Sequence, residues 1–142
     1  MAIYSLGVRT TNVTVSNTNW TLIAAATDRG YIMELGVWMA AATASVLGFG
    51  RPAAVGITPT TPVTILAEDP AAPASTLTTA LAWGTLPTAP TAFNRRINLP
   101  ATIGAGVILT FPRGFIVPVS GNVTTYNITA SGVMDLHVVC ED

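Results

Sequence analysis

Short segments between prolines and glycines are the feature that most limits how this chain can fold. Ten prolines and twelve glycines are spread along 142 residues, and they interrupt any regular element after a few residues. The intervening segments are rich in threonine and valine, whose branched Cβ atoms suit a pleated strand. Lysine and glutamine, which favour helices, do not occur, and glutamate is rare. The pattern therefore predicts an all-β fold.

The clearest predicted strand covers residues 31–39, where every odd-numbered residue is apolar. That face should point at the core, because alternate side chains of a strand share one side. Other strands are predicted at residues 12–15, 20–26, 45–51, 63–67, 93–98, 107–111, 115–117, 126–130 and 133–139, with a hairpin turn at residues 131–132. This pattern of many short segments indicates a single-domain antiparallel β-sandwich or jelly roll of about eight or nine strands.

The ends and the middle of the chain raise separate questions. Residues 12–142 should form the β-sandwich domain. Residues 1–11 are either an N-terminal arm that adds a strand to a neighbour's sheet or an ordinary first strand of the same domain. Long loops rich in proline, alanine and threonine are expected at 52–62 and 70–90. The apolar residues in this region indicate that the loops pack on something; they are Leu66, Leu81, Trp83 and Leu86.

A deficit of charge bears on the class of protein. Only 9% of the residues are charged and the net charge is −1, whereas soluble domains carry about 25% charged residues. We interpret the deficit as a sign that the chain is a subunit with much of its surface buried in an assembly. We prefer this to the alternative of a secreted protein with a neutral surface. Residues 31–50 are too interrupted to span a membrane. The net charge gives no field that would attract nucleic acid.

Few side chains could support chemistry. The single histidine, His137, shares a strand face with Asp135, and such a pair could orient a base, but we prefer the interpretation that His137 is a half-exposed strand residue. Cys140 is the lone cysteine and is expected to be buried. Glu68 and Asp69 could begin a calcium site only with further oxygens. We therefore expect no enzyme, no catalytic or metal-binding residue, no cofactor and no small-molecule substrate.

Four Asn-x-Thr sequences begin at Asn12, Asn19, Asn122 and Asn127. This sequence is the acceptor for N-linked glycans in secreted proteins. Because no signal peptide is visible at the start of the chain, we interpret all four as parts of threonine-rich strands and turns.

Aromatic and arginine side chains are the best candidates for an interface, because both are enriched at protein contacts. All six basic residues are arginines. Trp38 is expected in the core, whereas Trp83, between the long loops, is the best interface anchor. Arg95 and Arg96 should point to opposite faces of their strand. The candidate interface residues are Ile3, Tyr4, Leu6, Arg51, Trp83, Arg95, Arg96 and Arg113.

Several stretches resemble small structural proteins of tailed bacteriophages. They are residues 48–59 (GFGRPAAVGITP), 80–85 (ALAWGT), 95–100 (RRINLP) and 111–114 (FPRG), and residues 115–130 are similar to the closing strands of a jelly-roll virion protein. Together they cover about the last two-thirds of the chain and are similar to head decoration, or cement, proteins. The resemblance implies a location on the outer capsid surface after synthesis in a bacterial cytoplasm. It also implies two partners, the major capsid protein and copies of the chain in a dimer or trimer.

Three other functions stay open at this point. The chain could be another virion component, such as a tail, neck or fibre subunit. It could be a carbohydrate-binding module whose exposed aromatic residues stack on sugar rings. The third alternative is a hydrolase that uses His137 and Asp135.

Overall fold

The computed structural model describes residues 2–142 and contains strands but no α-helix within them. The all-β prediction is therefore confirmed. The strands are β1 (Ile3–Arg9), β2 (Thr18–Ile23), β3 (Gly30–Met39), β4 (Ser45–Gly50), β5 (Ile57–Pro59), β6 (Leu66–Ala67), β7 (Thr78–Ala80), β8 (Trp83–Thr85), β9 (Arg95–Leu99), β10 (Gly106–Val117), β11 (Asn122–Asn127) and β12 (Met134–Glu141).

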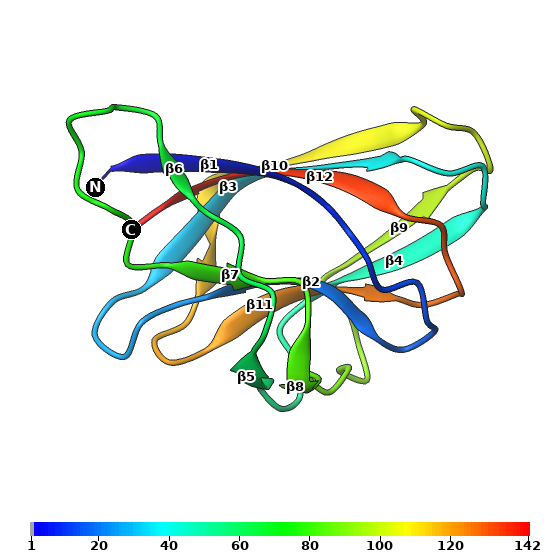
Figure 1. Cartoon of the computed structure of the whole chain (residues 1–142), viewed down its shortest axis with the longest axis horizontal. Helices are drawn as coiled ribbons and strands as arrows, with labels where there is room; N and C mark the ends of the chain where they lie inside the picture. Colours follow the sequence, from blue (N-terminus) through cyan, green and yellow to red (C-terminus); the bar gives the residue numbers. More distant parts are fainter. Residues whose placement is uncertain (1) are drawn as a thin grey trace.

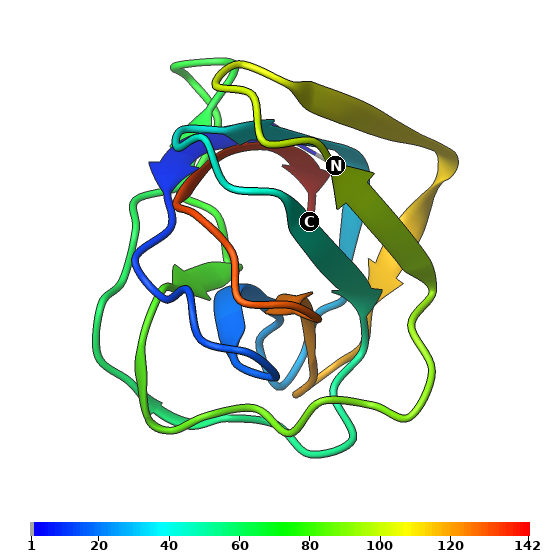
Figure 2. The ribbon, with the colours of Figure 1, turned by 90° about the vertical axis from the view of Figure 1, so that its right-hand side faces the viewer.

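Two five-stranded sheets form a sandwich (Figures 1 and 2). Sheet A has the order β10-β3-β12-β1-β6, and sheet B has the order β7-β2-β11-β4-β9. Eight strands pair antiparallel in a nested way: β1 with β12, β2 with β11, β3 with β10 and β4 with β9. This nesting, in which the chain passes between the sheets, is the topology of a jelly roll.

The core lies between the two sheets and is built from alternate residues of their strands. In β12, Met134, Leu136, Val138 and Cys140 are buried and their neighbours are half-buried, as a strand with one face on the core requires. The largest fully buried side chains are Trp20, Tyr4, Tyr126, Phe49, Leu22, Ile32 and Leu35.

The segment between β4 and β9 contains the four strands beyond the jelly-roll eight. β6 extends the edge of sheet A and β7 extends the edge of sheet B. β5 and β8 pair with each other and lie outside sheet B (Figure 1). The prediction that these loops pack on the domain is confirmed for Leu81 and Trp83, which are buried, whereas Leu66 is 63% exposed. The Tyr126 hydroxyl of β11 donates to the Thr88 carbonyl and ties the segment to sheet B.

Several predicted boundaries were wrong. Residues 12–15 are a turn-containing connection, and the first strand is Ile3–Arg9 instead. Residues 131–132 are not a hairpin turn, because β11 and β12 belong to different sheets. Residues 107–111 and 115–117 form one long strand, β10, whose pairing with β3 is interrupted between Thr110 and Phe115.

The start of the chain is an ordinary strand of this domain, the second of the two alternatives. β1 pairs with β12 along its whole length and with β6 at Tyr4 and Ser5. Met1 lies outside the described residues.

A bulge in β3 alters which of its residues face the core. The register with β12 shifts between Val139, opposite Glu34, and Cys140, opposite Ile32. Met33 is the extra residue, so the alternation reverses there. Ile32 is fully buried while Tyr31 is only half-buried. The predicted apolar face is therefore correct for Leu35, Val37 and Met39 and wrong for the first part of the strand.

Candidate functional site

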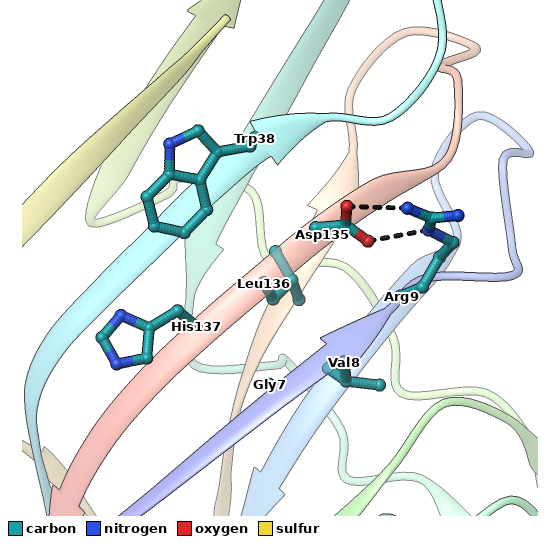
Figure 3. A pocket seen from close by; sticks show the side chains of 7 residues that line it. All are labelled: Gly7, Val8, Arg9, Trp38, Asp135, Leu136 and His137. Atoms are coloured by element: carbon teal, nitrogen blue, oxygen red, sulfur yellow. Dashed lines mark hydrogen bonds and ion pairs between the residues drawn. The ribbon is translucent and has the colours of Figure 1, made fainter. Parts of the chain in front are cut away.

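The outer face of sheet A carries a broad hollow of about 550 Å³. Its walls come from three adjacent strands, β1, β12 and β3 (Figure 3). Register aligns its residues in two rows across the strands. One row is Arg9, Asp135, Trp38 and Gly106, and the next is Gly7, His137, Gly36 and Ile108.

Trp38 lies across the sheet surface and does not project away from it. A Cβ added at Gly36 would clash with the six-membered ring of the indole, and one added at Gly106 would clash with its five-membered ring. The two glycines therefore create the space in which the ring rests. Trp38 is half-exposed, so the prediction that it belongs to the core was wrong. It lies on the side of β3 opposite Val37 and Met39.

His137 lies beside the indole. The centroids of the two rings are 6.4 Å apart and their planes are inclined by 26°. In Figure 3 both rings are seen nearly face-on above the ribbon. Gly7 lies opposite His137 in β1, and a Cβ added there would meet nothing within 4 Å. The floor next to the rings is therefore open.

Arg9 and Asp135 close one side of the hollow with a two-point ion pair. Arg9 Nε lies 2.7 Å from Asp135 Oδ1, and Arg9 Nη2 lies 2.8 Å from Oδ2. The hydrogen bond from Arg9 is the main cause that lowers the pKa of Asp135 below its ordinary 3.8. The pair is fixed in orientation although both side chains are largely exposed.

The pair of His137 and Asp135 that was considered as a possible base does not form. Asp135 is held by Arg9, and His137 Nδ1 lies 3.4 Å from Glu34 Oε1 instead. Cys140 follows three residues later but is buried on the core face. Burial raises the pKa of its thiol to about 12, so the thiolate needed of a nucleophile is absent at neutral pH. These side chains do not assemble a nucleophile with a base.

Glu68 and Asp69, the other acidic pair, lie just after β6. Asp69 Oδ1 accepts a hydrogen bond from the Ala71 amide at 2.9 Å, as a turn-forming aspartate does. Within residues 2–142, no group of three or more metal-ligating side chains of the types His, Cys, Asp and Glu occurs.

The predicted interface residues divide into buried and exposed sets. Tyr4 and Leu6 are 1% and 3% exposed, because the even-numbered residues of β1 face the core, and Trp83 is 8% exposed. These three were wrong as surface residues. Ile3 and the four arginines Arg51, Arg95, Arg96 and Arg113 are exposed.

Two of these arginines cover phenylalanine rings where β9 and β10 meet at the open side of the sandwich. The Arg51 guanidinium lies 4.7 Å from the centre of the Phe115 ring, and that of Arg95 lies 5.8 Å from the centre of Phe111. Such contacts hold a cation over an aromatic face. Arg96 points the other way, as predicted, since Arg95 pairs with buried Phe49 and Arg96 with Gly48.

The sequence interpretation missed Arg9 and the exposed position of Trp38. A usable signal is present in the spacing of glycines. Gly36 precedes Trp38 by two residues, as Gly7 precedes Arg9, and residues two apart share a face of a strand. A glycine beside a large side chain on one face marks a place where that side chain can lie flat.

Comparison with known proteins adds nothing to what the fold shows. No family model, curated protein or solved structure matches this chain. Among the described residues, no helix has the length and apolar character needed to cross a membrane.

Proposed function

We propose that this chain is a structural virion protein, a capsid decoration protein that binds the major capsid protein and copies of itself on the outer surface of a phage head. The observation that carries the proposal is a difference in charge between the two edges of sheet A. The jelly-roll topology, the low charge and the phage-like sequence stretches are consistent with it.

The β10 edge is basic. We use this name for Ile108, Arg113 and Ile116 of β10 together with Arg95, which belongs to the adjacent β9 of sheet B and lies over Phe111 of β10. The only ion pair between an arginine and a carboxylate within residues 2–142 is that of Arg9 and Asp135, so neither arginine of this edge forms an ion pair within these residues. Glu141 lines one hollow with Arg113 without pairing to it. Ile108 and Ile116 are 52% and 38% exposed beside them.

The β6 edge is acidic. This name denotes Ile3, Leu66, Glu68 and Asp69. A second hollow of about 420 Å³ is lined by Ile3, Glu68 and Asp69 together with Ala2 and Ala72. Ile3 and Leu66 are 46% and 63% exposed. Each edge therefore combines exposed apolar side chains with charges of one sign, and the two signs are opposite.

The two edges lie on opposite sides of sheet A, so a contact between them joins copies head to tail. Such a contact closes into a ring when the rotation per copy permits it. Complementary charge steers association and excludes wrong pairings. The contact also covers strand edges that would otherwise be free to aggregate.

Charge reversal at each edge tests the self-association. We expect the wild-type chain to sediment as an oligomer, and both the double variant Arg95→Glu/Arg113→Glu and the double variant Glu68→Arg/Asp69→Arg to sediment as monomers. A mixture of the two variants should associate again, because each reversed edge then meets a reversed partner. A monomeric wild type, or variants that associate as the wild type does, would contradict the proposal.

Capsid binding is tested separately with capsids of the same virus assembled without this chain. We expect the added protein to sediment with them and immunogold label to decorate the heads of complete virions. Label on the tail, neck or fibres would favour the alternative virion component. No label on any part of the virion would exclude both.

A further inference from the structure

We propose that the hollow on the outer face of sheet A binds a neutral saccharide, with one sugar ring stacked on Trp38. This inference does not depend on the proposed virion function. It rests on three properties of the hollow: an exposed aromatic platform, a fixed polar wall and an open floor between them.

The platform is the indole of Trp38, continued by the imidazole of His137 at 6.4 Å. Gly36 and Gly106 hold the indole flat against the sheet, because any side chain at either position would lift it. The axial C–H groups of a pyranose form an apolar patch with a partial positive charge, which complements the negative face of an aromatic ring. A flat ring with one face on backbone and the other open to solvent offers that surface without rearrangement.

The polar wall suits hydroxyl groups. A sugar hydroxyl both donates and accepts hydrogen bonds. The Arg9–Asp135 pair presents N–H donors and carboxylate oxygens side by side, and its two-point geometry fixes their directions. On the other side, His137 offers a ring nitrogen, and Glu34, beyond the lining residues, lies 3.4 Å from its Nδ1. The wall thus has both hydrogen-bonding roles at fixed positions, as ligand sites generally do.

The charges on this face favour a neutral ligand over nucleic acid, which could also stack on a ring. Asp135 lines the hollow and Glu34 lies next to His137, against one guanidinium, that of Arg9. Glu141, farther along β12, lines a separate hollow with Arg113. Phosphate binding requires several unpaired cations, and the single cation here is already paired. A phosphate backbone would therefore be repelled.

The floor gives the site its depth. Gly7 is exposed in the middle of the hollow, and nothing lies within 4 Å of the position that a Cβ would occupy. His137 of β12 and Arg9 of β1 border this gap. The space above Gly7 is therefore available to the edge of a sugar ring whose face rests on Trp38.

Tryptophan fluorescence provides a direct readout. Trp20 is fully buried and Trp83 is 8% exposed, so quenching by acrylamide reports mainly on the half-exposed Trp38. The probes are neutral gluco-, galacto-, manno- and N-acetylglucosamine oligosaccharides, first on an array and then in solution at millimolar concentration. We expect at least one of them to bind and to protect Trp38 from the quencher.

Two variants locate the site. Trp38→Ala should weaken binding by at least about tenfold because it removes the stacking contact. Gly7→Val fills the floor without a clash, and a β-branched residue suits an exposed strand position. We therefore expect Gly7→Val to lose binding while its thermal unfolding midpoint is unchanged or raised. Ile57→Ala, at a 61% exposed residue on the far side of the sandwich, is the matched control and should bind as the wild type does.

Three results would overturn the proposal: no binding by any oligosaccharide of the panel, binding that survives both Trp38→Ala and Gly7→Val, or binding of nucleotides alone. The outcome is separate from that of the capsid experiments, since an isolated monomer is enough for the titration.

Discussion

Asn127 is the residue at which buried polar groups converge at one end of the sandwich. Its side-chain oxygen accepts hydrogen bonds from Asn19 Nδ2 at 2.9 Å and from Ser131 Oγ at 2.7 Å, and its own Nδ2 donates to the Asn12 carbonyl at 2.9 Å. Thr125 in turn donates to Asn19. Together these bonds hold the connections before β2 and after β11 onto the end of sheet B.

The same cluster bears on the Asn-x-Thr sequences. Asn19, Asn122 and Asn127 are 1%, 3% and 0% exposed, so a glycan cannot be attached to them in the folded chain. The interpretation of these three as parts of strands is confirmed. Asn19 and Asn127 have the hydrogen-bond partners that buried amides need, because an unpaired amide in the core is costly. Asn122 Oδ1, in contrast, has no partner among the described residues.

Asn127→Ala should destabilise the protein more than a single lost hydrogen bond would. It leaves buried groups of Asn19 and Ser131 without partners, and we expect the free energy of unfolding to fall by about 2–3 kcal/mol. Urea denaturation followed by circular dichroism measures the change. Ser131→Ala, which removes one donor and leaves the rest paired, is the control. Equal losses for the two variants would show that the cluster does not act as a unit.

Gly36→Ala tests whether the Trp38 indole lies flat on the sheet over Gly36. The added methyl group would clash with the indole, so the ring must lift from the sheet. We expect a cost of about 1–3 kcal/mol from the forced shift and faster acrylamide quenching of tryptophan. Gly7→Ala is the matched control, since its methyl group meets nothing within 4 Å. Unchanged quenching in Gly36→Ala would contradict the described position of Trp38.

At the scale of single elements, the regular strands were predictable and the irregular ones were not. The predicted limits of residues 31–39 and 45–51 lie within one residue of β3 and β4, because apolar alternation is enforced by burial on one face. β1 was predicted only as one of two alternatives, because the residues of a strand do not show whether its partner, here β12, belongs to the same copy of the chain. The bulge at Met33 leaves no local signal, since it depends on pairing with β12, about a hundred residues later.

The candidate site could be predicted only in part for the same reason. His137 and Asp135 were correctly placed on one face, since both belong to one strand. Their true partners, Glu34 and Arg9, come from neighbouring strands, and strand order is a property of the tertiary fold. Sequence spacing within a strand carries no information about which strand lies beside it.

Asp142, directly after β12, connects this strand to the segment between β4 and β9. The connection depends on pH. The Asp142 carboxylate accepts hydrogen bonds from Ser75 Oγ at 2.8 Å and from the Thr76 amide at 2.6 Å. Burial is the largest single influence and raises the pKa of Asp142, but the hydrogen bonds together outweigh it and lower the pKa below 3.8. The charged form is therefore favoured in the folded protein.

Asp142→Asn should remove this pH-dependent contribution. A lowered pKa stabilises the folded state above about pH 3.8, and the contribution is lost as the pH falls through the folded-state pKa. We expect the variant to unfold at lower urea concentration than the wild type at pH 7, and the difference to shrink at pH 3 and below. Asp28→Asn, at an exposed loop residue, serves as the control. A difference that is constant with pH would exclude a role for the charge.

At the scale of the whole molecule, the fold class could be predicted from composition. The arrangement of the segment between β4 and β9 could not. Loops of this length in a compact domain usually have a function of their own. Here β6 and β7 place one end strand on each sheet, and β5 and β8 cover the outside of sheet B (Figure 1). Sheet A keeps its outer face uncovered. The two faces of the molecule therefore differ, and the proposed contact between edges would leave the hollow on the outer face of sheet A open.

The nesting of the strands has a consequence for biosynthesis. β1 has its main partner in β12, and β2 has its partner in β11, so these early strands leave the ribosome long before the strands with which they pair. Until then Tyr4 and Leu6 have no core to enter. We expect the chain to mature in one late, slow step, as folds dominated by distant pairings do, and nascent chains released before residue 134 to be captured by chaperones or lost to aggregation.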